Sequence, residues 1–137
     1  MLERIVSLFG VLFTLLLFAI CGAVFIGMVS QWYALQSEAQ FVAAGMSRYG
    51  GYTTDIDAQL KSFMQEMKMD RSKAQVKVSP SGGPVPWGKV VTCQITYPFR
   101  FNVGSFFTPF EVPVTGKGTS VSAYIPDTMS GIRYTSP

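Results

Sequence analysis

The chain has 137 residues, a mass of 15.0 kDa and a formal net charge of +3, and its 11 basic residues are scattered singly along the sequence. It contains no histidine, which removes the most common general base, the most common metal ligand and every pairing of serine or cysteine with histidine. The absence of a basic cluster argues against nucleic-acid binding.

The first element is a charge-free apolar run over residues 5–29. As a helix it spans about 37 Å, more than the ~30 Å hydrocarbon core of a bilayer. A cleaved signal peptide has an apolar region of only about 7–15 residues and a small-residue cleavage site, which the following "MVSQWYALQ" lacks. We therefore expect a retained membrane-spanning helix over residues 1–30. Because Arg4 precedes the run, the N-terminus is expected inside and the remainder outside.

The helix is predicted to continue beyond the membrane over residues 31–51. No proline interrupts it, and Gly50-Gly51 supplies a C-terminal stop. The polar residues between the apolar positions, such as Gln36 and Gln40, are expected to face water. The apolar positions follow in phase at spacings of three and four, which predicts one buried stripe: Trp32, Leu35, Ala39, Val42, Met46 and Tyr49.

A second helix is predicted directly after this stop. Thr53, Thr54 or Asp55 provides the N-cap, and acidic residues in the first turn favour the helix dipole. The helix is expected to end between Met69 and Arg71. Its apolar face contains residues at i, i+4, i+7, i+8 and i+11, namely Ile56, Leu60, Phe63, Met64 and Met67.

Beyond the second helix the apolar period changes to two, which is typical of strands. The segment "PSGGPVPWG" at residues 80–88 is predicted to be a loop from its prolines and glycines. Pro98 is expected to mark a bend or an edge, and Pro113 to interrupt a short strand. The expected strands lie around residues 74–79, 91–97, 99–103, 110–114 and 121–125.

Together these elements predict an α+β fold. A four- or five-stranded antiparallel sheet would be covered on one side by the amphipathic half of the first helix and the apolar face of the second. This arrangement gives an outer globular domain over residues 52–137. The polar tail "DTMSGIRYTSP" is expected to be loosely ordered.

No residue pattern indicates catalysis, a metal or a cofactor. Asp55 and Asp57 lie at a helix start, where capping explains them better than acid–base chemistry. Cys21 lies in the apolar run and Cys93 in the outer domain, so we expect two small buried apolar residues and no disulfide between them. The expected protein is therefore not an enzyme and needs no cofactor.

Two features of the apolar run suggest contacts between helices. Ala19, Ala23 and Gly27, with Gly22 beside them, form a small-residue face that lets helices approach closely. The alternative is that small residues are simply common in membrane helices. Glu3 lies at the edge of the run, where a carboxylate is costly if it is buried alone. It either rests in the cytoplasmic headgroup layer or serves as an assembly contact.

The segment "MLERIVSLFGVLFTLLLFAICGAVF", followed by an amphipathic helix and a small sheet, resembles type IV pilin-like subunits, and most of all the TadE-like (tight-adherence) pilins. The resemblance implies a single-span membrane precursor that is extracted into a filament with a core of apolar helices. It also implies leader removal by a prepilin peptidase, and pairing of Glu3 with the amino group of a neighbouring subunit. The sequence departs from the family because it shows no glycine-terminated leader and Glu3 lies two residues closer to the start than the usual pilin acid.

We therefore expect a structural subunit that self-associates into a helical homopolymer at the cell surface. Before assembly it would be a single-pass protein of the inner membrane, with a pilus assembly platform and a prepilin peptidase as partners. The residues expected at intersubunit contacts are Glu3, Ala19, Gly22, Ala23 and Gly27. The alternative is a monomeric single-pass accessory subunit of a secretion, conjugation or pilus-assembly machine.

Overall fold

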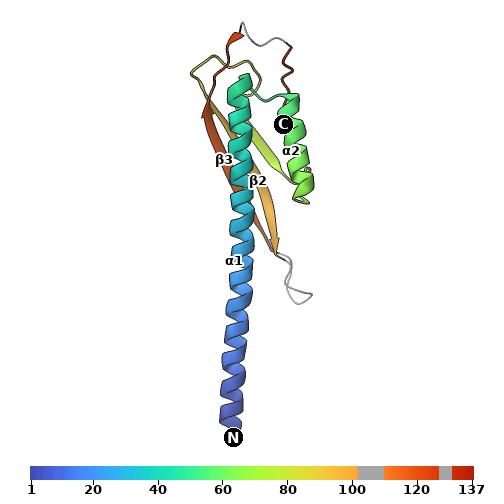
Figure 1. The fold of residues 1–137 in the computed structure, drawn as a ribbon. Coiled ribbons are helices and arrows are strands. Elements are labelled where there is room, and N and C mark those ends of the chain that lie inside the picture. Colours follow the sequence, from blue (N-terminus) through green and yellow to red (C-terminus); the bar gives the residue numbers. More distant parts are fainter. Residues whose placement is uncertain (102–109, 127–130) are drawn as a thin grey trace.

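The computed structural model describes residues 1–101, 110–126 and 131–137. Figure 1 shows one long helix whose C-terminal half carries a second helix and a sheet, while its N-terminal half projects alone. This is the expected α+β architecture. In chain order the elements are α1 (Leu2–Tyr49), α2 (Thr54–Glu66), β1 (Gln75–Ser79), β2 (Val90–Phe101) and β3 (Phe110–Val121).

Both helices follow the sequence pattern closely. α1 is one uninterrupted helix that ends at Gly50, whose φ of 77° places it in the left-handed region that glycine adopts without strain. α2 begins after Thr53, and the Thr53 hydroxyl accepts a hydrogen bond from the Ile56 N–H. It ends at Glu66 with Met67 as the C-cap, earlier than predicted, because Lys68 leaves the helical region with a φ of 55°.

The sheet has three antiparallel strands in the described part of the chain, in the order β1-β2-β3, rather than four or five. The segments predicted at 91–97 and 99–103 form one strand up to Phe101, beyond which residues 102–109 lie outside the described chain. The segment predicted at 110–114 continues to Val121 as one strand. The strand predicted at 121–125 is wrong, because β3 ends at Val121.

Pro98 and Pro113 do not interrupt the strands because they lie opposite each other in the β2–β3 ladder. The Lys117 N–H donates to the Oε1 of Gln36, so it points away from β2. Positions alternate along an antiparallel strand, and Pro113 is four residues from Lys117, so its nitrogen also points away from β2. Pro98 of β2 lies opposite Pro113, so its nitrogen correspondingly points away from β3. Neither proline therefore removes a ladder hydrogen bond, and both strands run straight through.

α1 packs at very close range on the core face of β3, and its glutamine side chains reach the edge of β3 that faces away from β2. Gly116 and Gly118 are buried against the backbone of Leu35 and Ala39, where a Cβ atom would overlap the helix. Four helical residues rise ~6.0 Å and two strand residues ~6.7 Å, so the two elements stay in register when they run side by side. Because the two glycines have no side chains, α1 and the sheet can approach closely enough to pack together.

Two glutamines of α1 pair with the exposed backbone edge of β3. The Gln36 amide donates to the Lys117 carbonyl at 2.6 Å and accepts from the Lys117 N–H at 3.0 Å. Gln40 makes the same pair of bonds to Thr119, at 3.2 and 3.4 Å. Gln40 is exposed, as expected, and Gln36 is partly buried, but the sequence pattern did not predict that both side chains bond to β3. They satisfy a strand edge that would otherwise invite pairing with another chain.

The hydrophobic core lies between the helices and one face of the sheet. The polar face of the sheet, with Thr92, Gln94 and Thr96, is only partly covered. The core contains the predicted α1 stripe except for Trp32 and Tyr49, together with Ala43, the buried face of α2, alternate residues of the strands and three residues of the connections: Leu35, Ala39, Val42, Ala43, Met46, Tyr52, Ile56, Leu60, Met64, Ala74, Val85, Val91, Cys93, Ile95 and Val114.

The C-terminal residues 131–137 are attached to the helix junction rather than loosely ordered. The Tyr134 hydroxyl donates to the Tyr49 carbonyl at 2.7 Å, and the Thr135 N–H donates to the Tyr52 carbonyl at 3.0 Å. Thr53 and Tyr134 also form an isolated antiparallel bridge. The tail therefore closes the end of the domain farthest from the projecting helix.

Candidate functional site

The most distinctive surface of the molecule is the projecting half of α1. Every residue from 1 to 23 is exposed, although the segment is almost entirely apolar. Its mean hydropathy over the most apolar 18-residue window is 2.7, and none of that window is buried. The exposed helix of residues 2–23 is about 33 Å long, close to the ~30 Å thickness of a bilayer core. By length and composition, α1 is compatible with a membrane anchor or a signal sequence.

This apolar surface has only two stable environments. Each large apolar side chain left in water forgoes about 1.5–3 kcal/mol of burial free energy. Exposed examples lie on opposite sides of the helix, such as Phe9 at 68% and Phe13 at 67% on one side and Phe18 at 72% on the other. No single flat interface can cover a helix that is apolar all round. The segment must be surrounded, either by lipid or by other helices.

The predicted small-residue face is only partly available to a neighbour. Ala19, Gly22 and Ala23 are exposed, and a Cβ atom added at Gly22 would meet nothing within 4 Å. Gly27 is different, because a Cβ atom there would lie 3.3 Å from the Phe99 ring of the same chain. The structure thus brings three of the four residues together on an open helix surface. It places Gly27 at an intramolecular contact between α1 and the sheet.

Glu3 is exposed in the first turn of α1, at the far end of the projecting helix. A carboxylate there interacts favourably with the unsatisfied N–H groups of the helix start. Arg4 follows directly and is exposed as well. The pair marks the boundary at which the charge-free surface begins.

Glu38 lies on α1 above the apolar run, where it is partly buried against the domain. Its burial, with a smaller contribution from the Glu66 carboxylate, raises the pKa of Glu38 above its ordinary value of 4.5. At pH values between 4.5 and the raised pKa of Glu38, the folded chain binds more protons than the unfolded chain. The free energy of unfolding should therefore fall as the pH rises through this window.

Glu38→Gln should raise the stability of the domain at about pH 8 and leave it little changed below about pH 4.5, because only the charged form of Glu38 is disfavoured by burial. Thermal unfolding of the full chain at several pH values checks this. Glu66→Gln is the matched control and should weaken the pH dependence only in part, since it removes the smaller of the two causes. A Glu38→Gln variant with the same pH dependence as the parent chain would contradict the assignment.

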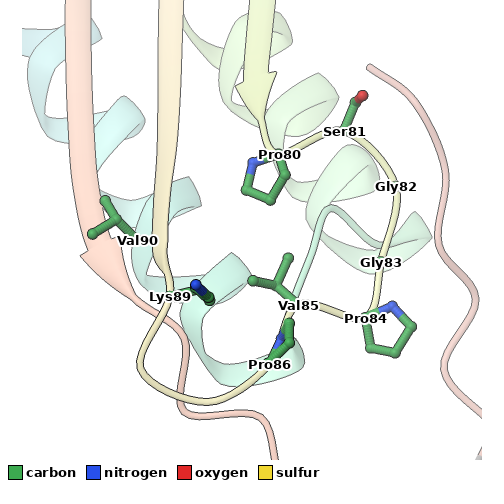
Figure 2. A pocket seen from close by; sticks show the side chains of 9 residues that line it. All are labelled: Pro80, Ser81, Gly82, Gly83, Pro84, Val85, Pro86, Lys89 and Val90. Atoms are coloured by element: carbon green, nitrogen blue, oxygen red, sulfur yellow. The ribbon is translucent and has the colours of Figure 1, made fainter.

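At the end of the domain away from the projecting helix, a loop encloses an open hollow of about 500 Å³. Figure 2 shows it bordered by the side chains of Pro80, Val85, Pro86 and Lys89. The loop is held by a hydrogen bond from the Val85 N–H to the Gly50 carbonyl at 2.7 Å. Its described lining consists of prolines, glycines, valines, one serine and one lysine, and these residues offer no acid–base pair or nucleophile with an activating base.

Comparisons of this chain with models of protein families, with curated proteins and with solved structures found no match. The functional argument therefore rests on the geometry of the chain itself. That geometry consists of an exposed apolar helix and a domain built on the continuation of the same helix.

Proposed function

We propose that this protein is a pilin-like structural subunit that polymerises through the projecting half of α1 into a helical filament. The observation that carries the proposal is the exposed apolar surface of residues 1–23, which projects from a domain packed on the second half of the same helix. In the filament these helices would form the core and the domains a surrounding sheath. Before assembly the same helices would reside in the membrane.

The rigid connection between helix and domain favours a polymer over a simple anchor. Gln36 and Gln40 bond to β3, and the glycines of β3 contact the backbone of α1, so the helix is part of the domain. An anchor works equally well through a flexible linker, which leaves the relative orientation of helix and domain unspecified. A helical lattice, by contrast, requires one fixed orientation of core and sheath in every subunit.

The face formed by Ala19, Gly22 and Ala23 supports close packing between neighbouring helices. In apolar surroundings helix association depends on van der Waals contact, and small residues let two backbones approach. These residues are exposed in the isolated chain, so the face is open to a second copy. The sheath domain would remain outside, because α1 is exposed up to Ala23 and first becomes partly buried at Val24.

Ala19→Leu and Ala23→Leu should lower the yield of sheared surface filaments by about tenfold or more, because each adds bulk where helices approach closely. Cys21→Leu is the matched control: it enlarges a residue at the same depth, about 160–200° away around the helix from both alanines. The amount of chain in membrane and sheared fractions, measured by immunoblot and electron microscopy, gives the readout.

Two results would count against the filament. Equal loss of filaments in Cys21→Leu and the alanine variants would remove the role of the small face. A chain found only as a detergent-extracted monomer, with no sheared fibres, would instead support the accessory single-pass subunit. The near match between the exposed helix and one bilayer thickness is the observation that favours this second function.

A further inference from the structure

The membrane-proximal end of the sheet lies level with the apolar run of α1. The Phe99 ring contacts Gly27, which fixes the height of β2 against the helix. If the hydrocarbon core begins at Ile5, its ~20 helical residues end near Val24, and Gly27 lies only about 5 Å above that boundary. Phe99 and the residues around it therefore occupy the headgroup layer of a membrane that α1 spans.

A cavity of about 250 Å³ opens at this same end of the domain. β1 begins at Gln75, opposite Thr96, so among the described residues no strand pairs with the following part of β2 on that edge. The turn after α2 and Gln31 of α1 complete the walls. The cavity thus lies between three elements, at the height of the headgroup layer.

The charged side chains that line this cavity are mainly cationic. Lys68, Lys73 and Arg100 contribute three positive charges, and Glu111 is the one carboxylate among the described lining residues. Glu111 is engaged by Arg100, with 3.2 Å between Oε1 and Nε. The Asp70 carboxylate lies near Lys73, and the two lysines together outweigh it, which favours an anion in the cavity.

The backbone that carries the two lysines is fixed to the sheet. The Asp70 N–H donates to the Tyr97 hydroxyl at 3.0 Å, which attaches the turn to β2. The Lys73 N–H donates to the Asp70 carbonyl at 3.1 Å. The turn that carries the two lysines is therefore attached to β2 and is not a loose loop.

Gln31 supplies a second and independent indication of a ligand. It lines the cavity, and its Nε2 atom is buried without a hydrogen-bond partner in the part of the chain that the structure describes. A buried amide donor without a partner costs about 1–3 kcal/mol, so such groups normally meet an acceptor. Because the Nε2 atom itself is buried, the Gln31 side chain must rotate toward the cavity for an anionic oxygen there to satisfy this donor together with the lysines.

We propose that this cavity binds the phosphate of an anionic phospholipid in the headgroup layer on the domain side of the membrane. The phosphate would accept from the Gln31 amide and lie between Lys68 and Lys73. Phe99 and the methionines of the lining provide an apolar wall for the lipid backbone, which a soluble phosphate would not need. Trp32 and Tyr33, 46% and 70% exposed, lie just above on α1, as interfacial aromatic residues do.

The inference depends on α1 spanning a membrane and not on polymerisation. The test therefore uses the monomeric full chain in maltoside micelles, titrated with dihexanoyl phosphatidylglycerol and, separately, with inorganic phosphate. Amide NMR shifts report binding, in particular those of the Gln31 side chain. Lys68→Gln/Lys73→Gln should weaken lipid binding about tenfold or more, since each lysine near a charged lipid surface contributes substantially.

Lys77→Gln/Lys89→Gln is the matched control, because it removes the same charge from exposed positions away from this end. It should leave the lipid affinity within about twofold of the parent chain. The dispersion of the same spectra shows whether each variant is folded. Three results would overturn the proposal: no saturable shift at Gln31, inorganic phosphate binding as tightly as the lipid, or equal weakening by the control. A chain that binds the lipid but forms no filaments would leave the proposal intact.

Discussion

Gly118→Val is expected to detach α1 from the sheet and to destabilise the domain by about 3 kcal/mol or more. A Cβ atom at Gly118 would overlap the carbonyl group of Ala39, and one at Gly116 would lie 2.6 Å from the Gln36 nitrogen. The obstructing atoms belong to a hydrogen-bonded helix backbone, which cannot move aside as a flexible side chain can. The helix as a whole must shift, which breaks the bonds of Gln36 and Gln40 to β3.

The direction of this effect separates the structural explanation from intrinsic propensity. Valine is among the best strand-forming residues and glycine among the poorest, so propensity alone predicts that Gly118→Val is stabilising. Thr119→Ala is the control, since Thr119 is exposed on the opposite face of the same strand. It should change stability by no more than about 1 kcal/mol. Hydrogen exchange of the β2 and β3 amides measures both variants. Unchanged or slower exchange in Gly118→Val would contradict the close contact.

The helices could be predicted from the sequence because each depends on signals within its own segment. The length and phase of α1 follow from the spacing of its apolar residues, and its end follows from Gly50. The same holds for the start of α2 at Thr53. These signals need no knowledge of what the helix packs against.

The strands were predicted less well because their limits depend on partners in other elements. Pro98 and Pro113 each suggest a break when considered alone, and they are tolerated only because they face each other with both nitrogens away from the ladder. Likewise, the predicted strand stopped at residue 114, before Gly116 and Gly118, whose place in β3 is explained by the close contact with α1. Pairing between distant residues is not visible in the period of a single segment.

The candidate site shows the same division. The exposed apolar helix follows from composition, whereas the contact between Phe99 and Gly27 depends on how the sheet is placed along α1. The cationic cavity draws Lys68, Lys73 and Arg100 from two segments that are far apart in sequence. No local spacing connects them, so only the folded arrangement reveals the cluster.

Glu3→Gln and Glu3→Ala are expected to reduce filament yield strongly while leaving membrane insertion intact. In the proposed bundle the Glu3 carboxylate would lie among apolar helices and need a cationic partner from a neighbouring subunit. Breaking a buried ion pair costs roughly 3–5 kcal/mol, which corresponds to a hundredfold or greater loss of association per contact. Glu3→Asp, which keeps the charge, should retain part of the yield. Sheared-fibre yield and resistance to alkaline extraction from membranes measure the two properties separately.

A competing explanation is that Glu3 only stabilises the start of α1. The same variants test this explanation. Glu3 is exposed beside the first-turn N–H groups of α1, and a carboxylate there contributes about 0.3–1 kcal/mol to the helix by itself. That role predicts slight fraying of the first turn and unchanged filaments in Glu3→Gln. Glu66→Gln provides the matched control, because it neutralises an exposed carboxylate at the end of α2. Filament loss in Glu3→Gln but not in Glu66→Gln would assign Glu3 to assembly, whereas equal yields in both would reduce it to a helix-terminal charge.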